Sequence, residues 1–182
     1  MSLADSAETV ILVDDDDNPL GVAGKLDAHR RGLRHRAFSI IAVNAVGDLL
    51  LQRRAAGKYH SAGLWTNACC GHPRPRETTA AAARRRIGEE LGVVAELQPI
   101  GRIAYHADLA GGMVENEVAH LFACRLGGRL DPDPAEVSDW RWISPIELTI
   151  ELARTPGSFT AWFRHYLQVA RPLMLDPLRA VA

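Results

Sequence analysis

The chain has 182 residues, of which 47% are hydrophobic and 24% are charged, and its formal net charge is −1. This length and composition are typical of one globular domain. We expect a single domain over residues 1–182, with a core at about 25–170 and a poorly ordered tail at 171–182. Because the net charge is close to zero, the chain lacks the basic field of proteins that bind nucleic acids or anionic membranes.

The cysteines and the first five residues indicate in which cellular compartment the protein is expected to work. Cys69 and Cys70 are adjacent and therefore poor disulfide partners, and together with Cys124 they give an odd count and no disulfide framework. This favours a reduced compartment. Met1–Asp5 lacks the basic and apolar regions of a secretory leader, and no run approaches the ~20 apolar residues of a membrane span. We therefore expect a cytoplasmic protein, a monomer or weak dimer, with no membrane or nucleic-acid partner.

The first expected elements are extended. The apolar run Val10–Val13 predicts a strand, and Gly21–Lys25 predicts a second extended segment. Four consecutive acids, Asp14–Asp17, lie between them. Neighbouring side chains point in different directions and cannot all converge on one ion, so we interpret the acids as a solvated turn rather than as a cation site.

Residues 26–36 contain His29 and His35 among four arginines. A separation of six residues is not the spacing of one helical face. Taken alone, two arginine-flanked histidines are more typical of an exposed segment than of a ligand pair.

A hairpin is expected next. Ala37–Val43 is apolar and β-branched, which predicts a buried strand, and Leu49–Arg54 reads as the returning strand after a turn at Asn44–Asp48. Arg53, Arg54 and Lys58 then precede a thiol- and imidazole-containing segment. Arginine offers phosphate oxygens a planar fork and lysine offers a point charge. An anion site is therefore the functional interpretation, and ordinary surface charge is the alternative.

The stretch Thr66–Val93 is the most informative in the chain. We expect its first part to be a loop that holds a thiol and an imidazole, Cys70 and His72. We expect its second part to be a charged helix. Thr78 or Thr79 is a suitable N-cap for this helix.

The helix in this stretch should end at Gly92, a residue type common at helix C-termini. Its buried stripe should contain residues at three- and four-residue spacing: Ala80, Ala83, Ile87 and Leu91. Two oppositely charged pairs favour intrahelical ion pairs worth ~0.2–0.5 kcal/mol each: Arg85 with Glu89, and Arg86 with Glu90. Gly88 costs the helix up to ~1 kcal/mol relative to alanine, which suggests close packing at that position.

Two strands should follow the helix. Gln98–Asp108 predicts a strand that contains Tyr105, and Met113–Arg125 predicts another that carries Glu115 and Glu117. Strand side chains alternate, so these two glutamates share one face. Paired carboxylates repel unless a cation or a shared proton lies between them, which favours a metal or catalytic role over a solvent-facing pair.

The C-terminal part predicts one more strand and two helices. Asp139–Ile143 reads as a strand with its tryptophans on one face, and Ser144 begins a helix with a capping-box pattern that Thr155–Gly157 ends. Ser158 is expected to cap a last helix that reaches Gln168. Its aromatic residues have helical spacing and are more typical of core than of ligand contacts: Phe159, Trp162, Phe163 and Tyr166. This order of elements predicts a mixed α+β sandwich.

The spacing of Gly71, Glu77 and the run Arg85–Val93 resembles the Nudix box, a loop–helix–loop that holds divalent metal on helix carboxylates against a diphosphate. Most Nudix hydrolases have glutamate at the position of Arg86. Four features resemble type I isopentenyl-diphosphate Δ-isomerases instead: the loop Thr66–Pro73, the segment His35–Ser39, the Glu115-Asn116-Glu117 motif, and Arg86 itself.

The resemblance implies a Nudix-like α/β/α sandwich with a mixed sheet, and an isomerase that interconverts isopentenyl and dimethylallyl diphosphate. It implies ligands for one divalent cation, Mn²⁺, Mg²⁺ or Zn²⁺: His29, His35, His72, Glu115 and Glu117. Glu90 would hold Mg²⁺ against the substrate diphosphate. The diphosphate contacts would be Lys25, Arg54, Lys58 and Arg86. Cys70 and Glu117 would be the acid–base pair, with Tyr105 hydrogen-bonded to Glu117 and Trp162 covering the hydrocarbon.

These residue types suit the implied chemistry. Moving a double bond by one carbon requires a proton to be added at one carbon and another removed elsewhere, so two positioned groups are needed. The intermediate has carbocation character, which favours a dry site with an aromatic face. Nearby cations should favour the thiolate of Cys70.

Two other functions are open to such a chain. A Nudix pyrophosphohydrolase acting on a nucleoside diphosphate derivative is the main alternative, and a non-catalytic diphosphate-binding module is the other. Arg86 argues against hydrolysis, because an arginine repels metal and attracts phosphate where a hydrolase needs a metal ligand. The Cys70–Glu117 pair argues against a module that only binds.

Overall fold

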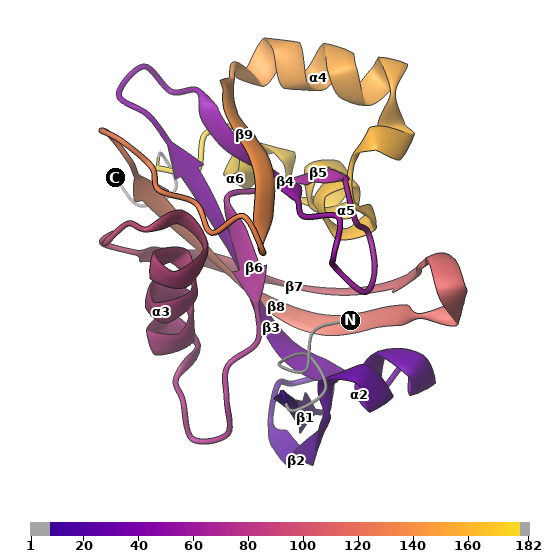
Figure 1. The fold of residues 1–182 in the computed structure, drawn as a ribbon. Helices are drawn as coiled ribbons and strands as arrows, with labels where there is room; N and C mark the ends of the chain where they lie inside the picture. Colours follow the sequence, from indigo (N-terminus) through magenta and orange to yellow (C-terminus); the bar gives the residue numbers. More distant parts are fainter. Residues whose placement is uncertain (1–7, 179–182) are drawn as a thin grey trace.

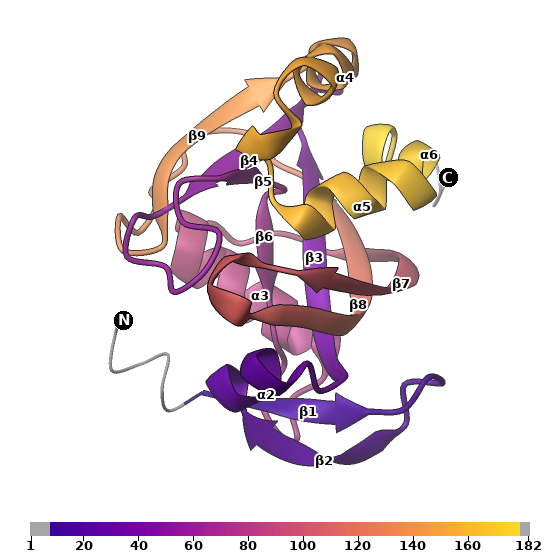
Figure 2. The same ribbon diagram turned by 90° about the vertical axis from the view of Figure 1, so that its right-hand side faces the viewer.

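The structure, a computed structural model, describes residues 8–178. Its strands form one mixed sheet with helices on both sides, so the predicted α+β sandwich is confirmed (Figure 1). Helix α3 (Thr79–Leu91) packs on one side, and α4 (Pro145–Arg154), α5 (Ala161–Val169) and α6 (Arg171–Leu175) lie on the other (Figure 2). Within residues 8–178, no helix is long and apolar enough to cross a membrane.

The strands are β1 (Thr9–Val13), β2 (Pro19–Gly24), β3 (His35–Val43), β4 (Leu49–Arg54), β5 (Trp65–Thr66), β6 (Cys69–Gly71), β7 (Gln98–Asp108), β8 (Val114–Arg125) and β9 (Val137–Ile143). A short helix, α2 (Lys25–Arg31), and two 3₁₀ turns, η1 (Ala110–Gly112) and η2 (Pro156–Ser158), complete the description.

Strand β3 organises the sheet. It pairs in parallel with β8, where His35 lies opposite Glu117, and antiparallel with β6, where Ser39 lies opposite Cys70. Strand β7 pairs with the far edge of β8 and places Tyr105 opposite Glu117. The register therefore puts Tyr105, Glu117 and His35 in one row across three strands.

Side chains alternate along β3 and divide the core into two layers. The layer that contains α5 takes these residues from β3: Ala37, Ile41 and Val43. The layer that contains α3 takes these: Phe38, Ile40 and Ala42. Strand β6 follows the same rule, because Cys69 is buried on the α3 side and Cys70 packs on the α5 side. The two adjacent cysteines thus face opposite layers.

The loop predicted at the start of the Thr66–Val93 stretch is partly wrong. Cys69–Gly71 forms β6 because the edge of β3 accepts its backbone hydrogen bonds. The approach is close at Gly71, where an added Cβ would lie 3.0 Å from Phe38 Cζ.

Helix α3 has the predicted ends. Thr78 Oγ1 accepts a hydrogen bond from Ala81 N–H, and Gly92 adopts a left-handed conformation with φ 68°. Within the predicted stripe Ala80 is only partly buried, and Ala82 is fully buried in addition. The close packing predicted at Gly88 is wrong, because an added Cβ would meet only Val93 O at 3.6 Å.

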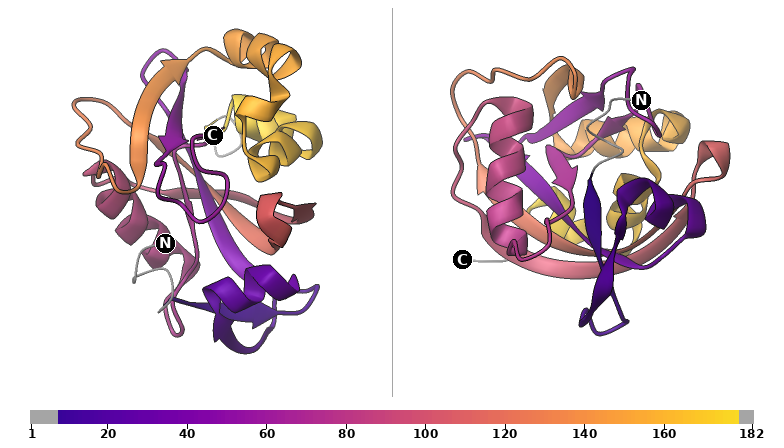
Figure 3. Two further views of the ribbon diagram at one scale, coloured as in Figure 1. Left: turned by 45° about the vertical axis from the view of Figure 1, so that its right-hand side comes forward. Right: turned by 60° about the horizontal axis from the view of Figure 1, so that its bottom comes forward.

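The N-terminal segment differs from its prediction at Lys25, which begins α2 instead of ending an extended segment. In Figure 3 this short indigo helix lies beside the N-terminal hairpin of β1 and β2. Helix α2 ends at Gly32, whose φ of 62° turns the chain back towards β3. The reversal brings His29 and His35 together, with ring centroids 4.8 Å apart. Both side chains are fully buried, so the expectation of an exposed arginine-flanked pair is wrong.

The acidic turn is solvated except at Asp17. Its carboxylate lies 2.7 Å from Arg36 Nε and 2.8 Å from His120 Nε2. Only 10% of the Asp17 side chain is exposed, so the interpretation as a solvated turn is wrong for this residue, which instead links the turn to β3 and β8.

The C-terminal part also departs from its prediction. The capping box at Ser144 is present, but the last long helix has Thr160 as its N-cap, because Ser158 belongs to the preceding 3₁₀ turn. The tail expected from Arg171 forms α6, which is held by the fully buried Met174. The remaining tail, 179–182, and the expectation of no leader at 1–5 lie outside the described residues.

Candidate active site

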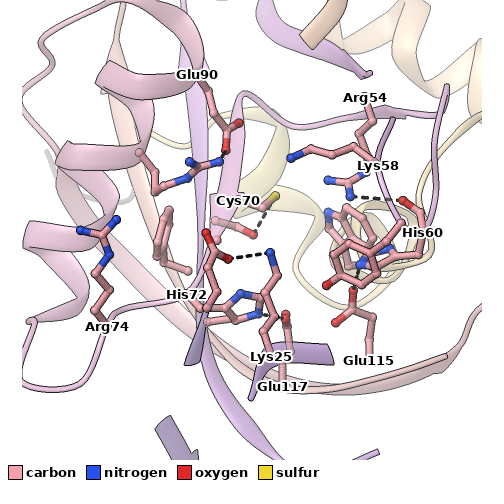
Figure 4. A pocket seen from close by; sticks show the side chains of 18 of the residues that line it. Lys25, Arg54, Lys58, His60, Cys70, His72, Arg74, Glu90, Glu115 and Glu117 are labelled. Atoms are coloured by element: carbon pink, nitrogen blue, oxygen red, sulfur yellow. Dashed lines mark hydrogen bonds and ion pairs between the residues drawn. The ribbon is translucent and has the colours of Figure 1, made fainter. Parts of the chain in front are cut away.

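A cavity of about 440 Å³ lies where the sheet meets α2, α3 and α5. In the view of Figure 4 the basic side chains Arg54 and Lys58 lie above Cys70, and the imidazole of His72 and the carboxylate of Glu117 lie below it. The cavity therefore joins two kinds of group, basic side chains suited to an anion and nitrogen and oxygen ligands suited to a cation.

We call the second kind the His–Glu cluster. It consists of His29, His35, His60, His72, Glu115 and Glu117. His72 Nε2 lies 2.9 Å from Glu117 Oε1, and His29 Nε2 lies 3.2 Å from Glu115 Oε2. The cluster gathers residues from α2, β3, the β4–β5 loop, the end of β6 and β8, so only the folded chain brings them together.

The backbone fixes which nitrogen of two imidazoles faces the cluster. His29 Nδ1–H donates to the carbonyl of Lys25, and His35 Nδ1–H donates to the carbonyl of Leu33, each at 2.7 Å. Each Nε2 is thereby left as a lone-pair donor turned inwards, the arrangement that protein metal sites use.

Three buried atoms of the cluster make no hydrogen bond within residues 8–178: Nε2 of His29, Nε2 of His35 and Oε2 of Glu115. Buried polar atoms without partners are costly. Imidazole nitrogens and carboxylate oxygens are ligands of divalent ions, so the residues present fit a divalent cation.

Electrostatics support the same fit. Burial and the neighbouring Glu117 carboxylate raise the pKa of Glu115. Burial also opposes ionisation of Glu117, but the adjacent imidazoles of His35 and His72 outweigh it and hold the pKa of Glu117 well below its ordinary value. Two adjacent carboxylates with opposite shifts are typical of a site that needs positive charge to ionise both.

Burial also keeps two imidazoles neutral. It lowers the pKa of His72 to about 3 and that of His60 to about 2, and Arg54 contributes to the second shift. Neutral imidazole is the form that binds metal.

Cys70 lies on the basic side of the His–Glu cluster. Its thiol donates to Asn67 Oδ1 at 3.2 Å and accepts from Ser39 Oγ at 3.5 Å. Burial raises the pKa of Cys70 to about 11, which outweighs the hydrogen bonds and the influence of Arg54. Arg54 favours the thiolate, as predicted for nearby cations, but desolvation of the thiolate dominates, so the net shift is upwards.

Two basic residues of the cavity, Lys58 and Arg86, already have acidic partners. Arg86 pairs with Glu90 at 2.5 Å and with Glu136 at 3.2 Å, and Lys58 also pairs with Glu136. Glu90 is buried, and its second oxygen accepts from Gln52 Nε2. We call Lys58, Arg86, Glu90 and Glu136 the charge-paired cluster.

The other predicted residues also line the cavity. Lys25 Nζ lies 2.8 Å from Glu8 Oε2. The guanidinium of Arg54 lies 5.3 Å from the ring centroid of Trp162. Tyr105 donates its hydroxyl proton to Glu117 Oε2 at 2.6 Å.

Sequence reasoning missed His60 and Glu136. His60 lies two residues beyond Lys58, in a segment that contains no metal-ligand spacing. Glu136 lies in the loop before β9 and looks like one acid among several. Both acquire their partners only through tertiary contacts, so no local signal distinguishes them.

The fold resembles solved Nudix structures. DR0079 from Deinococcus radiodurans matches with a TM-score of 0.69 at 22% identity, over 85% of this chain and 92% of that one. A MutT Nudix hydrolase from Burkholderia pseudomallei matches with a TM-score of 0.59 at 22% identity, over 75% of this chain and 98% of that one. At this identity the likeness concerns the fold alone.

The sequence comparisons are more specific. The NUDIX domain family matches residues 33–163. An isopentenyl-diphosphate Delta-isomerase of Burkholderia multivorans is 48% identical over 163 residues, 90% of this chain and 93% of that protein. Another isopentenyl-diphosphate Delta-isomerase, from Streptomyces coelicolor, is 47% identical over 176 residues, which cover 94% of this chain and 88% of that protein. The chain belongs to the isopentenyl-diphosphate Δ-isomerase family of Nudix proteins. Membership in this family confirms the resemblance predicted from the motifs and favours isomerisation over the Nudix hydrolase alternative.

Proposed function

We propose that the cavity binds isopentenyl diphosphate and that the chain interconverts it with dimethylallyl diphosphate. One observation carries the residue assignment: Cys70 on β6 and Glu117 on β8 line the same cavity. The reaction adds a proton at one carbon and removes one at another. Because burial raises the pKa of Cys70 and the adjacent imidazoles lower that of Glu117, we expect a protonated thiol and an ionised carboxylate at neutral pH. The pair therefore holds one transferable proton.

Glu117 is positioned for proton exchange. The Tyr105 hydroxyl donates to one of its oxygens and His72 contacts the other. A divalent cation held by the His–Glu cluster would supply positive charge beside this carboxyl group. Tyr105 and His72 keep its oxygens oriented, and the reaction is reversible, so the acid and base roles of Cys70 and Glu117 exchange with direction.

The diphosphate binds to basic side chains of the cavity. We assign these contacts to Lys25, Arg54, Lys58 and Arg86. Phosphate oxygens replace the carboxylate partners that Lys58 and Arg86 have in the structure, as charge-assisted bonds to phosphate are strong. Glu90, released from Arg86, would help to hold a Mg²⁺ ion against the diphosphate.

Trp162 covers the hydrocarbon. It lines the cavity but is 3% exposed, and its indole N–H donates to Thr66 Oγ1 at 2.9 Å. An aromatic face stabilises positive charge, and exclusion of water protects a carbocation-like intermediate. The hydrogen bond to Thr66 fixes the ring beside the reacting carbons.

We assign the finer properties as follows. Mg²⁺ accompanies the diphosphate, and Mn²⁺, Mg²⁺ or Zn²⁺ fills the His–Glu cluster. The chain works in the cytoplasm as a monomer or weak dimer and has no nucleic-acid or membrane partner.

Exchange of hydrogen with solvent tests the function. Protein, Mg²⁺, Mn²⁺ and isopentenyl diphosphate are incubated in D₂O with the thiols reduced, and both diphosphates are analysed by mass spectrometry. We expect deuterium in substrate and product and no released phosphate. Phosphate release without exchange would identify a hydrolase, and binding without either reaction would identify a binding module.

A further inference from the structure

We propose that His60 supplies a fourth imidazole ligand to the divalent-cation centre, in addition to the three histidines and two glutamates assigned above. This inference rests on the proposed function only in assuming that the His–Glu cluster binds a cation.

His60 completes a second ligand group inside the cluster. Its Nε2 lies 3.4 Å from Glu115 Oε1, and His29 Nε2 lies 3.2 Å from the other oxygen of the same carboxylate. The ligand atoms of His29, His60 and Glu115 all lie within 4.8 Å of one another, and all three residues are buried. His29 also belongs to the group formed with His35, His72 and Glu117, so the two groups meet at one imidazole.

The orientation of His60 matches that of the other imidazoles. Its Nδ1 lies 3.2 Å from Ser61 Oγ, which leaves Nε2 to face the carboxylate. Its ring stacks on that of His29 with centroids 5.6 Å apart. The carbonyl of His60 also accepts a hydrogen bond from Arg54 at 3.2 Å. Ser61 and His29 thus hold the ring and Arg54 holds the backbone, as the orientation of a ligand requires.

A buried lone pair needs a partner, and two buried atoms on this side of the cluster have no hydrogen-bond partner among the residues described. They are His29 Nε2 and Glu115 Oε2. A cation placed between them and His60 would satisfy all three residues. An added nitrogen ligand favours Zn²⁺ and Co²⁺ over Mg²⁺, whose preferred ligands are oxygens. His60 therefore acts on metal preference as well as on affinity.

Metal titration without substrate tests the proposal. Metal-stripped wild type, His60→Ala and His60→Gln are titrated with Mn²⁺, followed by electron paramagnetic resonance, and with Co²⁺, followed by its visible absorption. His106→Ala is the matched control, because His106 is exposed on β7. His35→Ala reports on the centre itself. Circular dichroism melting verifies that each variant is folded, and His60→Gln preserves side-chain volume if His60→Ala does not fold.

Both His60 variants should weaken Mn²⁺ binding about 10–100-fold and change the Co²⁺ spectrum, while His106→Ala matches wild type. Wild-type affinity and spectrum in the His60 variants would overturn the proposal. Weaker binding with an unchanged Co²⁺ spectrum would also overturn it, because His60 would then act only through Glu115. If His35→Ala also binds as wild type does, the cation centre fails, and the fourth ligand fails with it. The D₂O exchange experiment is independent of all these outcomes.

Discussion

The two clusters that border the cavity are prepared for ligands in opposite ways. In the His–Glu cluster, buried nitrogens and oxygens are held in place and several have no hydrogen-bond partner within residues 8–178. In the charge-paired cluster, Lys58 and Arg86 are already matched by Glu90 and Glu136. The first cluster gains contacts when a cation binds, because it has ligand atoms to satisfy. The second must exchange one set of ion pairs for another, so its binding is expected to be weaker and more sensitive to salt.

Removing the acid of the His–Glu cluster should have the largest effect. Glu117→Gln deletes a proton-transfer group and a cation ligand together. We expect kcat to fall by about 10²–10⁴-fold or more, the range for loss of a general acid or base, and Mn²⁺ affinity to fall as well. Activity is measured by conversion of isopentenyl diphosphate at saturating Mg²⁺ and Mn²⁺. Retention of kcat within tenfold of wild type would remove Glu117 from the mechanism.

Cys70→Ala should reduce kcat by a similar factor, about 10²–10⁴-fold, but leave cation binding intact. Cys69→Ala is the matched control, because the neighbouring thiol is buried on the opposite layer of the sheet. We expect that variant to retain kcat within a few-fold and to lose stability instead. Equal loss of activity in both variants would show that the thiol acts through packing and not through proton transfer.

Glu136→Gln probes the charge-paired cluster and should have a smaller effect. It frees Lys58 and Arg86 from one carboxylate. We expect KM to fall several-fold with kcat changed little, because the diphosphate no longer has to displace a charged partner. Steady-state kinetics at two salt concentrations measure this, with Glu151→Gln as control, since Glu151 pairs with Arg141 outside the cavity. A marked rise in KM would mean that Glu136 supports the bound diphosphate or its Mg²⁺.

Features that depend on local spacing could be predicted from the sequence, and features that depend on tertiary contacts could not. Local spacing is enough to place Glu115 and Glu117 on one face of β8 and to cap α3 at Thr78 and Gly92, because strand and helix periods determine both. It is not enough for His29 and His35, whose encounter depends on a left-handed Gly32.

Tertiary burial decides the remaining differences. The raised pKa of Cys70 follows from desolvation, which no sequence spacing reports. His60 and Glu136 acquire their partners across the sheet from residues 55 and 50 or more positions away, and Met174 turns an expected tail into a helix by packing. In each case the sequence shows the residue type, and the fold supplies the neighbour that gives it a role.

The last comparison separates the two clusters by the pH dependence of stability and not by activity. His72 has a folded pKa of about 3, below its unfolded value of 6.5, so the unfolded chain binds more protons between these values. Its contribution to the free energy of unfolding is therefore lost as pH falls from about 6.5 towards 3. Arg86 and Lys58 outweigh burial and lower the pKa of Glu136 from 4.5. That contribution is complete above pH 4.5 and is lost only as pH falls through the lower folded pKa.

Urea unfolding of the metal-free proteins at pH 7, 5.5 and 4 measures the free energy of unfolding of wild type, His72→Gln and Glu136→Gln. Replacing His72 by glutamine should flatten the decline of unfolding free energy between pH 6.5 and 4, by roughly 1.4 kcal/mol per pH unit at most. Glu136→Gln should leave that interval parallel to wild type and alter only the acid limb below it, by about 1 kcal/mol or less because the ion pairs are partly screened by solvent. If His72→Gln runs parallel to wild type from pH 7 to 4, the imidazole is not buried in its neutral form, and the His–Glu cluster is less prepared for a cation than its geometry indicates.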